Sequence, residues 1–312
     1  MSALLTALRA AAEISRLRII AILSKSELTV SEIVEILNQS QPRVSRHLKV
    51  LCDSGLLQRY QEGSWVFHRL NDTGAMASIT QGICRMINLA DPEFSQDQER
   101  LGKIKDRNAS QAAEYFSKNA TDWDSIRQMG VSDTDIEKKL IESLNIENPE
   151  LFVDLGTGTG RMLQIFSPFV KKGVGIDINR EMLLVARSNL DSAGVANCTV
   201  RQNNMSQLPF DHDTVDVIII HQVLHYIDNP EYTIVESSRA LKPGGQLIIV
   251  DFLPHDLEFL RDNHAHRRLG FSDATIKEWA QSNNLELSAA EHLHPRNPDT
   301  QSLSVGLWNL KK

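Results

Sequence analysis

The pattern of apolar residues changes near residue 56. Before this point, apolar side chains recur every three or four positions, which predicts amphipathic helices over residues 1–23, 29–37 and 41–53. Thr29 is suited to cap the second helix, and Pro42 stands in the first turn of the third, where a missing N–H group costs nothing. Residues 56–70 alternate between apolar and polar around Glu62-Gly63-Ser64, which predicts a β-hairpin.

From residue 151 onward, short apolar runs alternate with helical segments. Such runs are typical of strands that are buried on both faces of a parallel sheet. The predicted strands lie at residues 151–153, 174–176, 198–200, 215–220, 246–252, 285–292 and 303–310. The last two are expected to form a hairpin, so that one strand is reversed. The expected fold class is α/β with an α+β N-terminal domain, and its large sheet is seven-stranded, mostly parallel and Rossmann-like.

Residues 151–162, with the sequence LFVDLGTGTGRM, contain the strongest chemical signal. An apolar run ends at Asp154, and three glycines follow at alternate positions, namely Gly156, Gly158 and Gly160. Glycine is needed where the backbone takes positive φ or presses against a ligand. The dinucleotide fingerprint G-x-G-x-x-G is not met, because Arg161 stands at its last position.

A second apolar run ends at Asp177, where the next strand is expected to end. A carboxylate at this place can accept hydrogen bonds from both hydroxyls of a ribose. The alternative is that Asp154 and Asp177 mark two ordinary strand ends, each with an aspartate that caps the following helix.

The pattern D-x-G-x-G-x-G at 154–160, followed by Asp177, resembles the first motifs of class I S-adenosylmethionine (SAM) methyltransferases. The segment NNMSQLPF at 203–210 and the turn LKPGG at 241–245 resemble later motifs of that family, in its order. The resemblance covers residues 112–312 and implies that SAM or S-adenosylhomocysteine (SAH) binds to Asp154, Gly156, Gly158, Gly160, Asp177, Ile178, Asn204, Met205 and His221. Asn204 departs from the family, which has an acid there, but an amide oxygen can accept the same bond uncharged.

Tyr115-Phe116 and Trp123-Asp124 resemble the helix that covers the cofactor cleft in many of these enzymes. Packing of both aromatic pairs in the core is the alternative.

The third predicted helix has a polar face opposite its apolar stripe. Helix, turn, polar-faced helix and hairpin together make a winged helix-turn-helix over residues 1–72. The segment LTVSEIVEILNQSQPRVSRHLKVLCDSGLL resembles the core of ArsR/SmtB-type bacterial repressors. The resemblance implies that DNA is contacted by Ser40, Gln41, Arg43, Ser45, Arg46 and His47, and that Arg59 and Arg69 on the wing contact phosphates. A winged helix that binds only protein is the alternative.

One departure from that family bears on regulation. Its arsenic-sensing branch has Cys-x-Cys where Thr29-Val30-Ser31 stand here, and neither threonine nor serine supplies a soft thiolate ligand. Cys52 is alone beside the third helix and is expected to be a packed residue. The DNA-binding domain is therefore expected to lack a metal switch of its own.

Residues 73–111 are expected to be dimerisation and linker helices. In the resembled repressors the helix after the wing builds the dimer, and this role is implied for Ala75–Leu89; packing within one chain is the alternative. Asp91-Pro92 breaks that helix, and Gln96–Lys118 is polar and helical, which is typical of a spacer. A further helix is predicted over Asp133–Ile146, leading into a methyltransferase domain of residues 112–312. The expected partners are double-stranded DNA, with two operator half-sites for a homodimer, and SAM or SAH.

Methyl transfer is mainly a matter of positioning, and a general base is needed only for a poorly acidic acceptor. Candidates follow the fourth and fifth strands of the large sheet, where ligands bind in open α/β sheets: His225, Tyr226, His264 and His266, with His221, Asp251 and His255. On a helix His264 and His266 would point to different sides, so no metal is expected. The N-P-P-Y signature of DNA amino-methyltransferases is absent, which favours a small-molecule acceptor.

Composition changes this picture little. The net charge of −7 divides into +2 for residues 1–72, with nine Lys and Arg against seven Asp and Glu, and −9 for the remainder. So small an excess would not by itself indicate nucleic acid. The 3 cysteines are scattered and imply no disulfide framework. The N-terminal apolar segment is interrupted by charges, and no run reaches the length of a membrane span, so a cytoplasmic protein is expected.

Two hypotheses follow. The first is a transcriptional repressor whose methyltransferase-fold domain senses SAM or SAH. The second is an active methyltransferase for a small molecule, with an accessory or autoregulatory DNA-binding domain.

Overall fold

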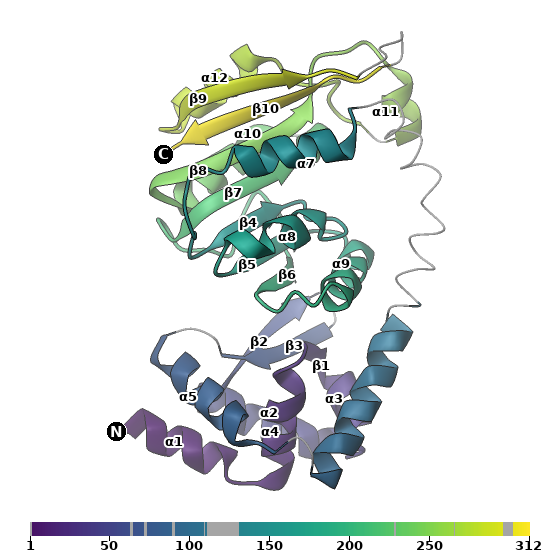
Figure 1. Ribbon diagram of the computed structural model, residues 1–312, viewed down its shortest axis with the longest axis vertical. Helices are drawn as coiled ribbons and strands as arrows, with labels where there is room; N and C mark the ends of the chain where they lie inside the picture. Colours follow the sequence, from purple (N-terminus) through teal and green to yellow (C-terminus); the bar gives the residue numbers. More distant parts are fainter. Residues whose placement is uncertain are drawn as a thin grey trace. The chain divides into compact units, whose positions relative to one another are not determined.

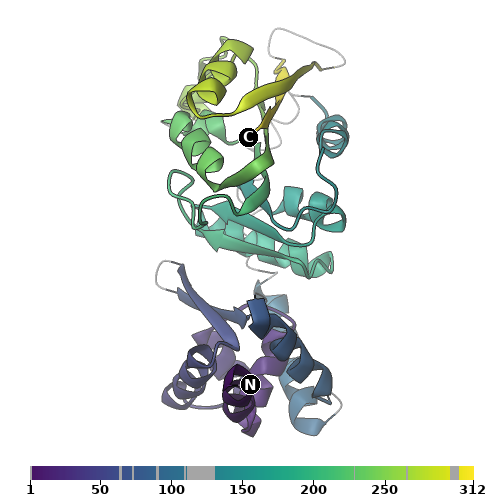
Figure 2. The ribbon, with the colours of Figure 1, turned by 90° about the vertical axis from the view of Figure 1, so that its left-hand side faces the viewer.

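The computed structural model describes residues 2–62, 65–71, 74–88, 91–108, 110, 131–227, 229–264, 266–295 and 302–312. They belong to two compact units, residues 1–110 and 111–312 (Figures 1 and 2). The aromatic pairs Tyr115-Phe116 and Trp123-Asp124 lie outside the described residues, as do residues 111–118 of the expected spacer.

The first unit is a winged helix-turn-helix with a three-stranded antiparallel sheet. Its elements are α1 (Ser2–Ala11), α2 (Ile14–Leu23), β1 (Leu28–Thr29), α3 (Val30–Leu37), α4 (Gln41–Asp53), β2 (Leu57–Glu62), β3 (Trp65–Leu70) and α5 (Gly74–Met86). The strands lie in the order β1-β3-β2, so β2 and β3 form the predicted hairpin. Both Thr29 and Glu32 take part in a capping box that begins α3, which confirms the predicted cap.

The prediction of one continuous helix over residues 1–23 is wrong. The helical conformation is interrupted at Glu13, whose backbone is extended. Its carboxylate accepts a 2.9 Å hydrogen bond from the Arg16 N–H. This bond caps α2, so the apolar spacing before and after Glu13 belongs to two helices. Ala7 and Ala10 of α1 and Ile19 of α2 are nevertheless buried in the same core.

A further helix, over residues 92–108, packs against the other elements of this unit (Figure 1). Leu101 and Ile104 join the core, and the buried Asp97 accepts two hydrogen bonds from the Arg18 guanidinium, at 2.6 and 2.7 Å. Arg100 donates to the Ile36 carbonyl at the end of α3. The segment expected as a polar spacer thus has a buried face as well as a polar one.

The second unit is a seven-stranded sheet with helices on both faces. Its elements are α7 (Asp133–Glu142), β4 (Phe152–Leu155), α8 (Arg161–Phe166), η1 (Ser167–Phe169), β5 (Gly173–Asp177), α9 (Arg180–Ser192), β6 (Cys198–Gln202), β7 (Val215–His221), η2 (Leu224–Tyr226), α10 (Pro230–Ala240), β8 (Leu241–Phe252), α11 (Phe259–His264), α12 (Asp273–Ser282), β9 (Glu286–Leu293) and β10 (Val305–Lys311). The strand order is β6-β5-β4-β7-β8-β10-β9. The strand β10 is antiparallel to both β8 and β9, whereas the other pairs in this sheet are parallel, so the predicted topology with one reversed strand is confirmed.

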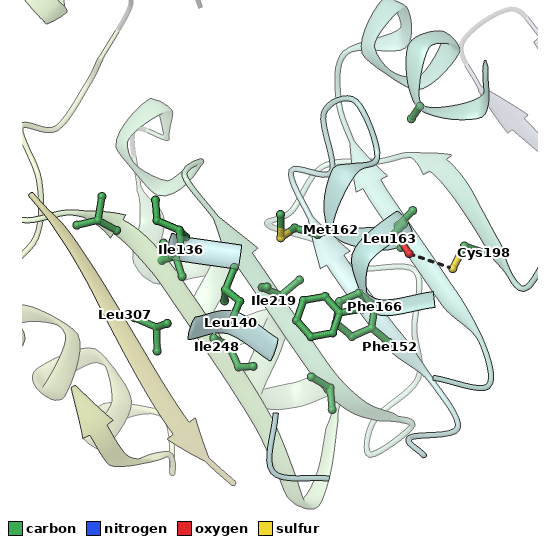
Figure 3. Packing of buried hydrophobic residues seen from close by; sticks show 14 of the residues in the cluster. Ile136, Leu140, Phe152, Met162, Leu163, Phe166, Cys198, Ile219, Ile248 and Leu307 are labelled. Carbon is green, nitrogen blue, oxygen red and sulfur yellow. Dashed lines mark hydrogen bonds between the residues drawn. The ribbon is translucent and has the colours of Figure 1, made fainter. Parts of the chain in front are cut away.

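Successive residues of each central strand point to opposite faces of the sheet, and each face has its own hydrophobic core. On one face, α7, α8 and α9 pack against residues such as Phe152, whose ring stacks on Phe166 with centroids 4.9 Å apart (Figure 3). On the other face, α10 and α12 cover Val153 and its neighbours. A sheet buried on both sides keeps its strand ends rigid, and those ends hold the site described next.

Candidate functional site

The glycine-rich turn joins β4 to α8 in a conformation that requires glycine. Gly156, Gly158 and Gly160 have φ values of +73°, +50° and +78°. The N–H groups of Gly156 and Thr157 both donate to the Ile176 carbonyl, at 2.7 and 2.9 Å. The turn is therefore fixed to β5 at the carboxyl edge of the sheet.

The space around each glycine differs. A Cβ atom on Gly156 would lie 2.5 Å from the Val223 side chain, and one on Gly160 would lie 3.1 Å from Ala186. A Cβ on Gly158 would meet only the Gly156 carbonyl oxygen, at 3.9 Å. Gly156 and Gly160 thus allow close packing of the protein, whereas Gly158 borders open space in which a ligand can approach the backbone.

Asp154 lies beneath this turn. Its carboxylate is fully enclosed and accepts a 2.6 Å hydrogen bond from the Thr157 hydroxyl. Burial raises the pKa of Asp154 to about 7, and the nearby charge of Asp177 adds to that rise. Asp154 is placed to shape the turn from below, since its carboxylate is sealed from solvent. Thr157, which sequence reasoning missed, stands three residues after the acid.

Asp177 closes the other side of the turn. One of its carboxylate oxygens accepts from the Gly158 N–H and the other from the Asn179 N–H, each at 2.8 Å. Burial raises its pKa, while these backbone bonds oppose the rise. Each carboxylate oxygen has a further lone pair for a hydroxyl donor. Beside it, the Ile178 side chain is 65% exposed, an apolar surface next to the acid.

Two more strand ends contribute to the same edge of the sheet. Asn204 and Met205 follow β6, and His221 ends β7, so the order β6-β5-β4-β7 places them on either side of the glycine-rich turn. The Asn204 amide oxygen accepts hydrogen bonds from the N–H and hydroxyl of Ser206. Met205 packs partly against the core beneath.

A second group of side chains follows β7 and β8. The His225 Nδ1 and an Asp251 carboxylate oxygen are 2.7 Å apart, and both side chains are buried. The His225 ring contacts the rings of Tyr226, Phe252 and His266, with centroids 4.1, 4.9 and 4.3 Å away. Sequence reasoning missed Phe252, because a phenylalanine at a strand end resembles any core residue.

The candidate His264 is not brought into this group. It ends α11, and its ring contacts Phe259, with centroids 6.3 Å apart. His266 lies beyond the end of α11, so His264 and His266 are not on one helix, contrary to the expectation from the sequence. Where the chain is described, no group of three His, Cys, Asp or Glu side chains could hold a metal ion.

Most of the residues predicted to contact DNA lie exposed on or beside α4 of the winged helix-turn-helix. They are Ser40, Gln41, Arg43, Ser45 and Arg46. His47 differs, because it is largely buried and its Nδ1 lies 3.6 Å from the Glu13 carboxylate. Burial lowers the pKa of His47. On the wing, Arg59 is exposed, whereas Arg69 donates two hydrogen bonds to Gln58.

Comparison with known proteins gives a consistent result. Residues 147–302, half of the chain, match the family described as methyltransferase domain, and residues 15–59 match the bacterial regulatory protein, arsR family. The uncharacterized methyltransferase YcgJ of Bacillus subtilis (strain 168) is 32% identical over 134 residues, which cover 41% of this chain and 52% of that protein. The ubiquinone/menaquinone biosynthesis C-methyltransferase UbiE of Vibrio vulnificus (strain YJ016) is 40% identical over 104 residues, covering 32% of this chain and 40% of that protein.

Among solved structures, a Bacillus halodurans protein described as a methyltransferase superposes with a TM-score of 0.51 at 20% identity, covering 56% of this chain and 98% of that one. At this identity the likeness shows the fold alone. The matches to YcgJ and UbiE span about half or less of those proteins' lengths.

Proposed function

The chain belongs to the methyltransferase-domain family and has an arsR-family regulatory domain before it, and from this premise we propose that it is a DNA-binding transcriptional regulator whose methyltransferase-fold domain binds SAM or SAH as its effector. The observation that carries the proposal is the open glycine turn beside Asp177. It stands in the same chain as a winged helix that has no Cys-x-Cys sensor at Thr29-Val30-Ser31.

The residues around the turn suit this cofactor. The Asp177 carboxylate would accept hydrogen bonds from the ribose hydroxyls, and the exposed Ile178 would contact the flat face of the adenine. The open backbone at Gly158 would allow the amino-acid part of the ligand to approach. When bound, SAM supplies an electrophilic methyl group. Asn204 and His221 would line the sides of the site, and Asp154 would hold the turn in shape.

The DNA-binding half of the proposal rests on α4. Its exposed polar face presents Arg43 and Arg46 beside short hydrogen-bonding side chains, the composition expected of a helix in a major groove. A ligand changes DNA affinity only by binding the DNA-bound and free forms differently. We propose SAM or SAH as the effector because the glycine turn and Asp177 of the second unit suit this ligand.

We extend the proposal to a homodimer that reads two half-sites. On α1, the Leu4, Leu5 and Leu8 side chains are 44%, 49% and 42% exposed, and Met86 at the end of α5 is 74% exposed. The helices α1 and α5 pack on each other within one chain. Apolar side chains left open on adjacent helices support contact with a second copy.

In the described part of the chain, no helix has both the length and the apolar character that crossing a bilayer requires. Because its proposed target is chromosomal DNA, we place the protein in the bacterial cytoplasm.

Titration calorimetry of the full chain with SAM and with SAH tests the cofactor site. Gly158→Ala puts a methyl group into the open space that the ligand would occupy, at a residue whose φ is +50°. It should weaken binding at least tenfold, because the methyl group would crowd the ligand and alanine is strained at this φ. Gly102→Ala is the matched control, since nothing lies within 4 Å of its Cβ in a helix of the other unit. Absence of binding by the wild type would refute the proposal.

A further inference from the structure

A cluster of histidine and aromatic rings lies where the segments after β7 and β8 meet, and effector sensing alone leaves it without a role. It consists of His225, Tyr226, Asp251, Phe252, His255 and His266 and is called the histidine cluster below. The segments are tied together by backbone bonds: Arg267 and Arg268 both donate to the His225 carbonyl, at 2.8 and 3.1 Å. Burial of the His225, Asp251 and His266 side chains shows that this is a packed group.

The hydrogen bond to Asp251 sets the tautomer of His225. The Asp251 oxygen that contacts His225 Nδ1 also accepts from the Phe252 N–H at 2.8 Å, so it acts as an acceptor. Nδ1 therefore carries a proton, which leaves the lone pair of His225 on Nε2. Among the described residues, Nε2 has no hydrogen-bond partner. An imidazole oriented by a carboxylate in this way is suited to accept a proton.

Two other histidines in the cluster have buried ring nitrogens that form no hydrogen bond with any described residue. The His266 side chain is 2% exposed, and neither of its ring nitrogens is hydrogen-bonded within the described ranges. His255 Nε2 is likewise buried and unbonded. Burial lowers the pKa of His266 to about 3, so this ring is neutral and offers one donor and one acceptor. Buried polar atoms are nearly always paired with protein, water or a ligand, so these nitrogens are positions at which a ligand with polar hydrogens or lone pairs can bind.

A metal ion does not fit this arrangement. The rings of His225 and His266 lie over each other, with centroids 4.3 Å apart and planes 38° from parallel, so their nitrogens do not converge on one point. The aromatic rings that His225 contacts suit an organic molecule with a planar or apolar body rather than a metal ion.

The cluster is joined to the cofactor turn through a short segment. Gln222 has a φ of +52°, and its N–H donates to the Val250 carbonyl at 2.7 Å. The next residue, Val223, packs so closely on the glycine turn that a Cβ on Gly156 would lie 2.5 Å from it. His225 follows two residues later. His225 and the proposed cofactor site are thus joined by one short, hydrogen-bonded segment of backbone.

We propose that the histidine cluster binds a methyl acceptor, a neutral small molecule with an O–H or N–H group on an aromatic or apolar body, and that His225 is its general base. This rests on the proposed function for the methyl donor. The acceptor gives its proton to His225 Nε2, and its freed electron pair forms a bond to the methyl carbon as the carbon–sulfur bond breaks. The sulfur keeps that bond's electron pair.

The proton on His225 is stabilised by Asp251 until it leaves to solvent. Asp251 is a positioning residue, because it acts through His225. His266 and His255 hydrogen-bond to the acceptor's polar groups, and Tyr226 and Phe252 pack on its body. The buried carboxylate disfavours an anionic acceptor, which is why a neutral one is expected.

The test uses 4-nitrophenol as a protic probe, whose visible absorbance reports loss of its proton. SAH binding is measured first by calorimetry. A protein that does not bind SAH would contradict the proposed function, and this outcome is distinct from a failure of the acceptor site. With SAH bound and the pH below the probe's own pKa, the wild type should raise the nitrophenolate absorbance in a saturable manner. If SAH binds and the absorbance does not rise, the proposal is overturned.

Variants then assign the proton acceptor. His225→Gln can still donate to Asp251 but has no basic nitrogen, so the absorbance change should be lost while SAH affinity stays within twofold of the wild type. His212→Gln is the matched control, because His212 is exposed in the loop before β7. A full absorbance change in His225→Gln would overturn the assignment.

The positioning role of Asp251 is tested by a measurement that needs no ligand. Nitrogen-15 NMR of the imidazoles should find His225 protonated at Nδ1 and unprotonated at Nε2 in the wild type. Asp251→Asn should shift the proton toward Nε2 and reduce the absorbance change at least tenfold, with the thermal midpoint recorded alongside. A wild-type His225 protonated at Nε2 would contradict the proposal whatever the variants' stability.

Discussion

At the scale of single residues, burial separates two acids that look alike in the sequence. Asp177 ends β5 and Asp154 stands one residue before the end of β4, and the sequence predicts that both bind the cofactor. Asp154 is 1% exposed and bonded to Thr157, whereas Asp177 holds the Gly158 N–H at the open side. The motif predicts where the acids lie, but which one a ligand can reach depends on side-chain packing from neighbouring segments.

The first prediction concerns Asp177. Asp177→Asn should weaken SAH binding by about 10- to 100-fold, because hydrogen bonds to a charged group are each worth about 1.5–3 kcal/mol. Calorimetry gives the dissociation constant, and Glu181→Gln, an exposed acid in the first turn of α9, serves as control. Unchanged affinity in Asp177→Asn would remove Asp177 from the site.

The second prediction concerns the pH dependence of stability. The folded pKa of Asp154 is about 7, above its ordinary value of 3.8, so its contribution to stability is complete at low pH and is lost as the pH rises through about 7. Asparagine does not ionise. Between about pH 5 and pH 8, the free energy of unfolding of Asp154→Asn should therefore rise relative to wild type by on the order of 3 kcal/mol.

Denaturant titrations at several pH values measure this difference. Asp211→Asn, a change of an exposed aspartate, should show no such trend. A difference between Asp154→Asn and wild type that is constant with pH would show that Asp154 is ionised in the fold throughout.

At the scale of elements, the sequence locates helices and strands well where local signals exist. The cap at Thr29 and the helix Gln41–Asp53 are found as predicted. The break at Glu13 was missed because apolar spacing continues across it. The buried face of the helix over residues 92–108 was missed as well, because Asp97 looks like a surface acid until its contact with Arg18, 79 positions away, is known.

The third prediction tests this contact. Asp97→Asn leaves the Arg18 guanidinium, whose side chain is 13% exposed, without its charge partner. Removing one member of a buried ion pair costs about 3–5 kcal/mol, so the first unit should unfold at a lower denaturant concentration. Glu99→Gln breaks the exposed pair with Lys103 on the same helix and should leave that transition unchanged. Equal transitions for Asp97→Asn and Glu99→Gln would contradict the account.

The fourth prediction concerns α4 and DNA from the protein's own promoter. Arg46→Ala should weaken binding and reduce the slope of log affinity against log salt by about 1, because each phosphate contact releases about one counterion. Fluorescence anisotropy at several salt concentrations gives the slope. Lys277→Ala removes an exposed cation from α12 of the other unit and should leave the slope unchanged. If both variants behave alike, α4 is not the DNA-contacting helix.

At the scale of the whole molecule, the sequence predicts two units and a seven-stranded sheet, because glycine turns and strand spacing are local features. It does not predict the histidine cluster as a unit. His225, Asp251 and His266 come from three segments, and only tertiary packing decides that His266 joins the cluster while His264 turns to Phe259. The residues expected at the cofactor site are easier to locate from the sequence, because each of them follows or ends a strand that the apolar pattern predicts.

The central claim is that one chain couples a SAM or SAH site to DNA affinity. Fluorescence anisotropy on labelled promoter DNA, at fixed salt, with SAM and SAH titrated separately into the complex, tests it most directly. We predict that one ligand changes the dissociation constant on the order of tenfold and the other does not, as expected for a coupling of 1–3 kcal/mol. Asp177→Asn should abolish this response and retain basal DNA binding. If both ligands bind and neither changes the affinity for DNA, the claim is contradicted.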